Sequence, residues 1–301
     1  MNRPSGRSSA QRGARRPVTF RRMKFGVTMF MTDQTMGPVE LARAVEERGL
    51  HSLYVPEHTH IPTSRRTPPP TGDAELRDEY KRTLDPFVAM AMAAAATERL
   101  VVGTGICLVA QRDPIVTAKE VASLDHLSGG RFVFGIGFGW NADEIEDHGV
   151  TMGDRRAVTR EHMLAMRALW DNDVGSYAGE FVQIPPSWSW PKPVHPGGPP
   201  VLIGGAPGPK LFAHVAEYAD GWIPIGGAGV KAALVDLHRA FDAVGRDPAS
   251  LRIVPFGTVP DPGKVEYYES IGITEVVLRV PGGDVDRVLP ILDEYAPLVH
   301  A

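Results

Sequence analysis

The chain has 301 residues, of which 43% are hydrophobic, and it carries a formal net charge of −4. This length allows one large domain or two ordinary ones, and the charge argues against a general nucleic-acid or membrane-surface binder. The single cysteine, Cys107, excludes an intrachain disulfide and no apolar run is long enough for a membrane span, so we expect a cytoplasmic protein.

Residues 1–22 differ from the rest of the chain, because they contain seven arginines and no acid. Such a composition cannot bury enough apolar surface to fold. The stretch that begins at Met23, Lys-Phe-Gly-Val, is typical of a first strand. We therefore expect a disordered basic N-terminal extension over residues 1–22 and a single domain over residues 23–301.

Predicted strands then alternate with predicted helices along the chain. We expect strands at 25–30, 52–55, 100–109, 132–136, 201–203, 222–225, 252–255 and 275–280. Helices are expected to begin at or near 38, 84, 114, 155, 209, 230, 263 and 285. Two connections are long: a proline-rich, charged insertion at 60–82, which predicts a lid or substrate loop, and a proline-rich connector at 184–200.

The number of strand–helix units decides between two fold classes. Eight units in about 280 residues predict a (β/α)8 TIM barrel, with the insertion after strand 2 and the proline-rich loop before strand 5. A doubly wound sheet is the alternative. The count, and the lack of a composition break between two halves, argue against it.

In a barrel, functional groups collect on the loops after the strands. His58 and His60 follow the second strand as an HxH pair, which in principle suits zinc. Most other histidines fall within predicted helices, so we expect no metal site. His58 alone fits either a hydrogen-bonded structural histidine or a group that exchanges a proton near neutral pH.

Glycines concentrate after the fourth and fifth strands. Gly135, Gly137 and Gly139 alternate along the fourth strand, which indicates either tight packing in a barrel or a cofactor that approaches the backbone closely. Their spacing lacks the GxGxxG of a dinucleotide site. Gly204 and Gly205 directly follow a strand and precede a helix, so their N–H groups suit a phosphate or another anion.

These segments together resemble one known family. The motifs are Val55-Pro-Glu-His58, Gly103-Thr-Gly-Ile106, Asp113-Pro-Ile-Val-Thr-Ala-Lys119, Leu124-Asp-His-Leu-Ser-Gly-Gly-Arg131 with Gly135-Ile-Gly-Phe-Gly-Trp140, Gly204-Gly-Ala206 and Ala219-Asp-Gly-Trp222. From Met23 to about Tyr295 the chain resembles the bacterial luciferase-like monooxygenase superfamily, in particular its deazaflavin (coenzyme F420)-dependent oxidoreductases.

The resemblance implies a cofactor at the carboxyl end of the strands, F420 or, alternatively, FMN. Glu57 and His58 are expected to border its ring, and Gly105-Ile106 to form a bulge with a non-proline cis peptide behind it. The cofactor-binding residues implied in this way are Glu57, Thr104, Gly105, Ile106, Phe138, Gly139, Asp143, Gly204, Gly205 and Ala206.

The resemblance also implies hydride transfer between the deazaflavin and an organic substrate, with His58 as the catalytic residue that exchanges the proton. Trp140 occupies the position at which sugar-phosphate dehydrogenases of the family have a glutamate, and Ala228 stands close to where they have a phosphate-binding lysine. We therefore expect an apolar or aromatic substrate pocket that includes Trp140, Trp188 and Trp190. The alternatives are an FMN-dependent monooxygenase that uses O2 and a non-catalytic deazaflavin-binding protein. A homodimer is the expected assembly.

Overall fold

The computed structural model describes residues 23–69, 72 and 75–299. The predicted basic extension at 1–22 lies outside the described residues. None of the helices in the described part of the chain combines the length and the apolar character needed to span a membrane.

Parallel strands form the centre of the molecule. In the described part of the chain a nine-stranded sheet has the order β10-β11-β1-β2-β3-β4-β7-β8-β9. Its strands are β1 (Lys24–Thr28), β2 (Ser52–Val55), β3 (Val101–Thr104), β4 (Phe132–Ile136), β7 (Val201–Gly204), β8 (Gly221–Ile223), β9 (Arg252–Ile253), β10 (Phe256–Thr258) and β11 (Glu275–Arg279).

The sheet closes on itself through an interrupted strand. Only Val254 and Pro255 separate β9, which pairs with β8, from β10, which pairs with β11. Proline has no N–H to donate to a ladder, so a single strand over 252–255 breaks at this point. The expected (β/α)8 barrel is therefore confirmed, although its seventh strand consists of two short segments.

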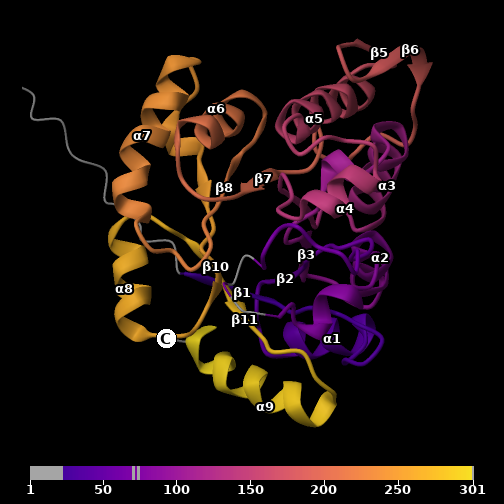
Figure 1. The fold of residues 1–301 in the computed structure, drawn as a ribbon. Helices are drawn as coiled ribbons and strands as arrows, with labels where there is room; N and C mark the ends of the chain where they lie inside the picture. Colours follow the sequence, from indigo (N-terminus) through magenta and orange to yellow (C-terminus); the bar gives the residue numbers. More distant parts are fainter. Residues whose placement is uncertain (1–22, 70–71, 73–74, 300–301) are drawn as a thin grey trace, which may run out of the picture.

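Each barrel strand is followed by a helix on the outside, and the helices form a ring in chain order (Figure 1). They are α1 (Pro38–Glu47), α2 (Pro86–Ala95), α3 (Pro114–Leu127), α5 (Arg155–Asp171), α6 (Pro209–Tyr218), α7 (Val230–Ala243), α8 (Pro262–Ser270) and α9 (Val285–Tyr295). Short elements are α4 (Ala142–Asp147) and the 3-10 turns η1 (Asp78–Lys81), η2 (Val109–Gln111), η3 (Pro248–Ser250) and η4 (Ala296–Val299).

Asp-Pro pairs start several of these helices. Asp85 accepts hydrogen bonds from the N–H groups of Phe87 and Val88, and Asp113 caps α3 in the same way. The aspartate satisfies free N–H groups of the first turn, and the proline after it needs no acceptor. The two Asp-Pro pairs therefore determine the residues at which α2 and α3 begin.

The core has two layers. One lies inside the barrel and contains Tyr54, Val133, Leu202, Ile223, Val254, Phe256 and Val277. The other lies between the strands and the ring of helices. At the amino end of the barrel, Glu275 accepts from Ser52 Oγ at 3.0 Å and from Arg252 Nη2 at 3.0 Å. These bonds satisfy a carboxylate that is only 5% exposed.

The region before the fifth strand contains two strands that the sequence did not predict. An antiparallel hairpin, β5 (Val174–Ala178) and β6 (Gln183–Trp188), occupies the first part of 184–200 and the residues before it. The hairpin packs on the outside of α5, at the edge of the ring of helices (Figure 1). Its two prolines, Pro185 and Pro186, fit a strand that has only one neighbour.

Candidate active site

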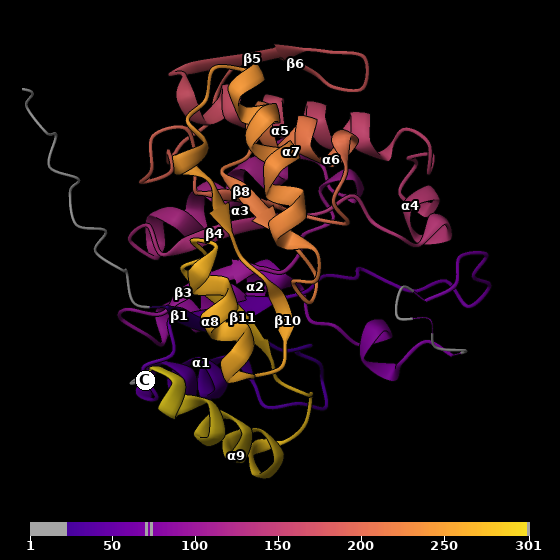
Figure 2. The same ribbon diagram turned by 90° about the vertical axis from the view of Figure 1, so that its left-hand side faces the viewer.

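A cavity of about 240 Å³ lies at the carboxyl end of the barrel. Strand ends form its floor, with Thr28, Pro56, Gly105, Phe256 and Arg279 among the lining residues. The insertion after β2 covers one side through η1. Figure 2 shows this insertion and α4 extending from the same end of the barrel.

His58 and Glu144 form a buried pair beside this cavity. His58 follows β2 directly, whereas Glu144 lies on α4, which follows β4. His58 Nδ1 lies 3.0 and 2.9 Å from the two carboxylate oxygens of Glu144. The two side chains are 7% and 1% exposed. An ionised carboxylate can only accept, so Nδ1 carries the hydrogen and Nε2 is left to exchange a proton.

Aromatic rings surround the imidazole. The ring of Tyr80, from η1, lies 5.3 Å from that of His58, and the ring of Trp140 lies edge-on at 5.9 Å. Phe30 packs on Tyr80 at 4.8 Å. Tyr80 and Phe30 also line the cavity, so the imidazole adjoins an apolar compartment.

Glu57 points away from this compartment. One carboxylate oxygen accepts from the Leu108 N–H at 2.6 Å, and the other accepts from Arg112 Nε at 2.6 Å. Arg112 also pairs with Asp85 and Glu120. Both oxygens are therefore engaged between β2 and the loop after β3, and the side chain ties these loops together.

The insertion is held on α4 by a series of polar contacts. Arg66 pairs with Asp143 at 2.8 Å and also with Glu146, and His60 Nε2 lies 3.0 Å from Asp147. The backbone N–H and the guanidinium of Arg66 hold the pKa of Asp143 below its usual range. Asp143, expected to line the cofactor tail, here binds the insertion. The two histidines of the HxH pair therefore contact different carboxylates, His58 that of Glu144 and His60 that of Asp147.

The bulge expected after β3 is present. The Gly105–Ile106 peptide bond is cis, as the resemblance implied. A Cβ on Gly137 would overlap the side chain of Ile106, and one on Gly135 would overlap the carbonyl of Thr104. Gly135 and Gly137 therefore make room for the bulge of the protein itself. The tight-packing interpretation is therefore confirmed for these two residues.

Several buried polar groups on the segments that follow β3 and β4 have no hydrogen-bond partner. The carboxamides of Asn141 and Gln111 are buried without hydrogen bonds, and so is Nη1 of Arg156, whose guanidinium lies 4.2 Å from the centre of the Phe138 ring. Buried polar groups normally have partners. A polar, phosphate-bearing cofactor would supply donors and acceptors here, so these residues fit such a group.

The loop Gly204–Gly205–Ala206 leads into α6, whose first turn has no side-chain cap. His214 on α6 lies 5.0 Å from the ring of Phe138, ring centre to ring centre. The N–H groups of this helix end thus lie on the same side of the barrel as Phe138 and Arg156. This arrangement suits an anion.

The three tryptophans expected to line the substrate pocket are not brought together. Trp140 lies against His58, but Trp188 and Trp190 are 77% and 58% exposed. Trp188 pairs with Val174 in the outer hairpin, and the carbonyl of Trp190 accepts from Lys119 on α3. Only Trp140 joins the group around His58.

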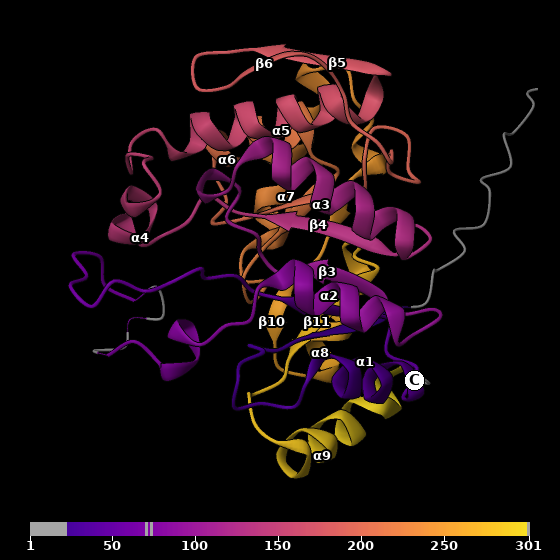
Figure 3. The same ribbon diagram turned by 90° about the vertical axis from the view of Figure 1, so that its right-hand side faces the viewer.

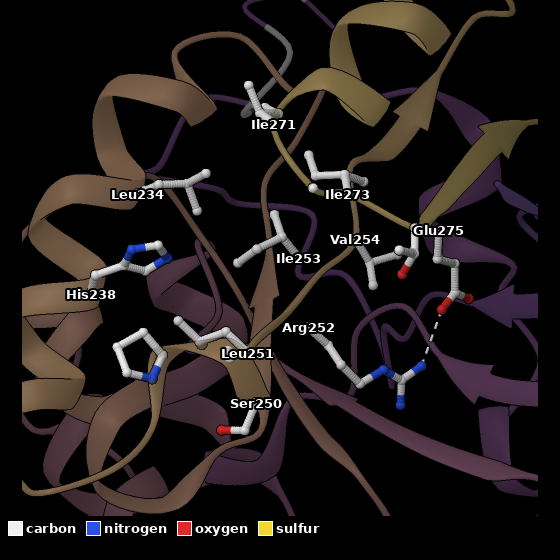
Figure 4. A pocket seen from close by; sticks show the side chains of 14 residues that line it. Leu234, His238, Ser250, Leu251, Arg252, Ile253, Val254, Ile271, Ile273 and Glu275 are labelled. Carbon is white, nitrogen blue, oxygen red and sulfur yellow. Dashed lines mark hydrogen bonds and ion pairs between the residues drawn. The ribbon is translucent and has the colours of Figure 1, made fainter. Parts of the chain in front are cut away.

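A second cavity, of about 360 Å³, lies at the opposite end of the barrel between α7 and the starts of β9 and β11 (Figure 4). The Arg252–Glu275 ion pair crosses one side, and His238 and Leu234 reach in from α7. In TIM barrels this end usually contributes to stability, whereas the active site lies at the carboxyl end.

Two residues of the site were missed from the sequence. Glu144 directly follows Asp143, the last residue expected at the site after the fourth strand, and Tyr80 lies in the insertion. A carboxylate one turn into a helix that follows a glycine-rich strand end is the only signal for Glu144. Its partner, 86 residues away, becomes visible only in the fold.

Comparison with known proteins gives consistent matches. The profile of the luciferase-like monooxygenase family matches residues 24–260. The uncharacterized protein Rv0953c of Mycobacterium tuberculosis is 43% identical over 277 residues, which cover 91% of this chain and 98% of that protein. A phthiodiolone/phenolphthiodiolone dimycocerosates ketoreductase of Mycobacterium bovis is 28% identical over 281 residues, 86% of this chain and 72% of that protein.

The fold is also found in solved structures. An F420-dependent secondary alcohol dehydrogenase, in complex with an F420–acetone adduct, superposes with a TM-score of 0.72 at 18% identity, over 92% of this chain and 99% of that one. The family profile spans most of the barrel, and the 43% identical relative spans nearly the whole chain. The chain belongs to the luciferase-like monooxygenase family.

Proposed function

We propose that this protein is an F420-dependent oxidoreductase that transfers a hydride between the deazaflavin and a small organic substrate. The observation that carries the proposal is the buried His58–Glu144 pair beside an apolar cavity at the carboxyl end of the barrel. Two similar proteins support it, since one is described as a ketoreductase and the other as an F420-dependent alcohol dehydrogenase.

The residues that would hold the cofactor lie on the loops after β3, β4 and β7. Gly105 and Ile106 would support the ring, and Phe138 with the loop 204–206 would hold the phosphate-bearing tail. When bound, the deazaflavin supplies or accepts the hydride, which is chemistry that protein side chains do not provide. The barrel contributes orientation and the exclusion of water.

His58 moves the proton that accompanies the hydride. Glu144 accepts the Nδ1 hydrogen, which fixes the tautomer and orientation of the ring and leaves Nε2 for the substrate oxygen. Thr83 Oγ1 donates to the carbonyl of His58 at 2.7 Å and so fixes the backbone. Tyr80 and Trp140 keep the imidazole away from bulk water.

A His58→Ala variant tests the proposal. We expect kcat to fall by about 10²- to 10⁴-fold, the usual contribution of a general acid or base, while the dissociation constant of F420 changes little. Absorption or fluorescence titration gives the dissociation constant and steady-state hydride transfer gives kcat. His60→Ala, which removes the exposed neighbour in the same motif, is the matched control. A wild-type kcat in His58→Ala would exclude His58 from the reaction.

A second candidate function is an FMN-dependent monooxygenase, which the family description favours. The purified protein is titrated with FMN and with F420, and oxygen consumption is measured with each reduced cofactor. Tighter binding of FMN with oxygen consumption would replace our proposal. Binding of F420 without turnover of any carbonyl or alcohol compound would instead indicate a deazaflavin carrier.

A further inference from the structure

Two arginines line the cavity, Arg77 from the insertion and Arg279 from the barrel. Arg279 is the last residue of β11, and its backbone is fixed because it pairs with Thr28 in β1 and its carbonyl accepts from the Tyr295 hydroxyl at 2.7 Å. The side chain is 45% exposed and lines the cavity. The guanidinium therefore extends from a rigid base towards the space next to Tyr80.

One carboxylate oxygen of the acid that faces Arg279 has no hydrogen bond. Glu79 Oε1 lies 3.8 Å from Arg279 Nη2 and 3.9 Å from Arg77 Nη1, and it is buried without a hydrogen bond. Both distances exceed the hydrogen-bonding range. By contrast, Arg252 lies 3.0 Å from its carboxylate. Glu79 therefore compensates the charge of Arg279, but the N–H groups of the Arg279 guanidinium remain available for another acceptor.

The rest of the lining is mainly apolar. Met29, Phe30, Ile225, Phe256 and Val280 contribute hydrophobic side chains. A guanidinium at the side of such a compartment binds an anion more strongly than one in open water, because the local dielectric is lower. The planar N–H fork of arginine matches the two oxygens of a carboxylate.

The sheet order sets the separation between this cation and the proton-transfer group. β11, β1 and β2 are consecutive neighbours in the sheet, so the strand ends that carry Arg279 and His58 are two strand spacings apart, about 10 Å. Tyr80 contacts both His58 and Phe30, and the rings of Tyr80 and Phe30 line the same cavity as Arg279. A ligand that reaches both needs several bonds between its two polar ends.

We infer that the substrate is an apolar carbonyl or alcohol compound with a carboxylate at the end remote from the reacting carbon, and that Arg279 binds this carboxylate. The inference rests on the proposed function and specifies its substrate class. Binding then combines the burial of an apolar body with one charge-assisted contact. Glu79, which competes for the same guanidinium, weakens that contact in the free protein.

The test compares 4-oxo-4-phenylbutanoate with its methyl ester, which have the same carbon skeleton and differ in charge. With wild-type protein and reduced F420, we expect kcat/KM to be about 10- to 100-fold higher for the acid, the range of one charge-assisted hydrogen bond. In Arg279→Gln this ratio falls to about one, mainly through KM of the acid, and Arg279→Lys retains part of it. Arg239→Gln, which alters an exposed arginine on α7, keeps the wild-type ratio.

Glu79→Gln separates a substrate anchor from a latch that merely holds the insertion. If Arg279 is the anchor, loss of the competing carboxylate lowers KM of the acid, whereas Arg279→Gln raises it. If the pair is only a latch, the two variants shift KM in the same direction, and the inference is overturned. Equal kcat/KM for acid and ester in the wild type would overturn it as well.

Binding of 4-phenylbutanoate, followed by calorimetry without turnover, distinguishes the two proposals. Binding that requires Arg279 in a protein that reduces no carbonyl compound would keep the carboxylate site and reject the proposed function. Reduction of the ester without any preference for the acid would do the reverse. Melting temperatures of all variants identify loss of folding.

Discussion

The carboxylate of Glu144 is almost completely buried, since its side chain is 1% exposed. A buried charge is tolerated only when a partner compensates it, and the partner here is the Nδ1 hydrogen of His58. The same contact fixes the orientation of the imidazole, on which the proposed proton exchange depends. The acid that contacts His58 thus lies on α4, four residues after Trp140.

Replacing Glu144 with Gln tests this positioning role. A carboxamide can present its NH2 group to Nδ1 and so favour the other tautomer. We expect kcat to fall by about 10- to 100-fold, as for the hydrogen-bond partners that orient metal-binding histidines. Binding of F420 should stay near the wild-type value, and the pH dependence of kcat should shift. Glu146→Gln, two residues along the same helix, is the control. An unchanged pH profile together with unchanged kcat would show that Glu144 is only structural.

His58 could be predicted because its position after a strand depends on local sequence alone. The direction of Glu57 could not, since its partners, Leu108 and Arg112, come from another loop. The same holds for Gly137, whose need to be glycine arises from Ile106 on the neighbouring strand. The sequence indicates which loops meet at this end of the barrel but not how their side chains pair.

At the scale of elements, α5 and the outer hairpin are joined by one carboxylate. Glu161 on α5 accepts from the N–H groups of Glu180, Phe181 and Val182, at 2.8 to 3.1 Å. Burial raises the pKa of Glu161, but these backbone donors outweigh it and lower the pKa below the ordinary value. The turn of the hairpin is therefore fixed by a side chain of a helix.

We expect Glu161→Gln to lower the free energy of unfolding at pH 7 by about 1–3 kcal/mol, because an amide oxygen cannot serve three N–H donors. A lowered carboxylate pKa stabilises the fold above the unfolded pKa of about 4.3, and this contribution is lost as pH falls below it. The difference between wild type and variant should therefore shrink below about pH 4.3. Urea unfolding at several pH values measures it, with the exposed Glu180→Gln as control. A constant difference across this range would contradict the assignment.

The hairpin could not be predicted from the local sequence. Pro185 and Pro186 lie in β6, which pairs with β5 alone and therefore tolerates residues without N–H donors. The position of the hairpin on α5 depends on Glu161, which lies near the turn of the hairpin in the fold but 19 to 21 residues before it in the sequence. The helices, by contrast, could be located well from Asp-Pro starts such as Asp113-Pro114 and from apolar periodicity.

At the scale of the whole molecule, one face exposes apolar side chains from two adjacent helices. Val88 and Met92 on α2 are 62% and 47% exposed, and Ile115 and Val116 on α3 are 49% and 55% exposed. Figure 3 shows these helices side by side on the outside of the barrel. Grouped apolar side chains of this kind are typical of an interaction surface. We propose that this face joins two subunits of a homodimer.

A charge in this face should separate the subunits. We expect the wild type to sediment as a dimer and Val116→Glu as a monomer with an unchanged circular dichroism spectrum, because the new carboxylate would be buried without a partner in the dimer. Val235→Glu, at a position on α7 with 53% exposure, is the control. A monomeric wild type, or a dimeric Val116→Glu, would rule this face out as the interface.

The barrel was predictable at this scale because eight strand–helix units leave few arrangements open. The closure of the barrel through the broken seventh strand could not be predicted. It depends on Pro255, which separates the segment that pairs with β8 from the segment that pairs with β11.

The insertion carries Tyr80 and Glu79, which line the cavity, and it is fastened to α4 through Arg66, Asp143 and Glu146. The same short helix holds Glu144 against His58. Exchange of this loop for another would thus alter the lining of the cavity and also disturb the acid that contacts the imidazole. A loop transplant that keeps the His58–Glu144 contact would therefore have to bring along a matching α4.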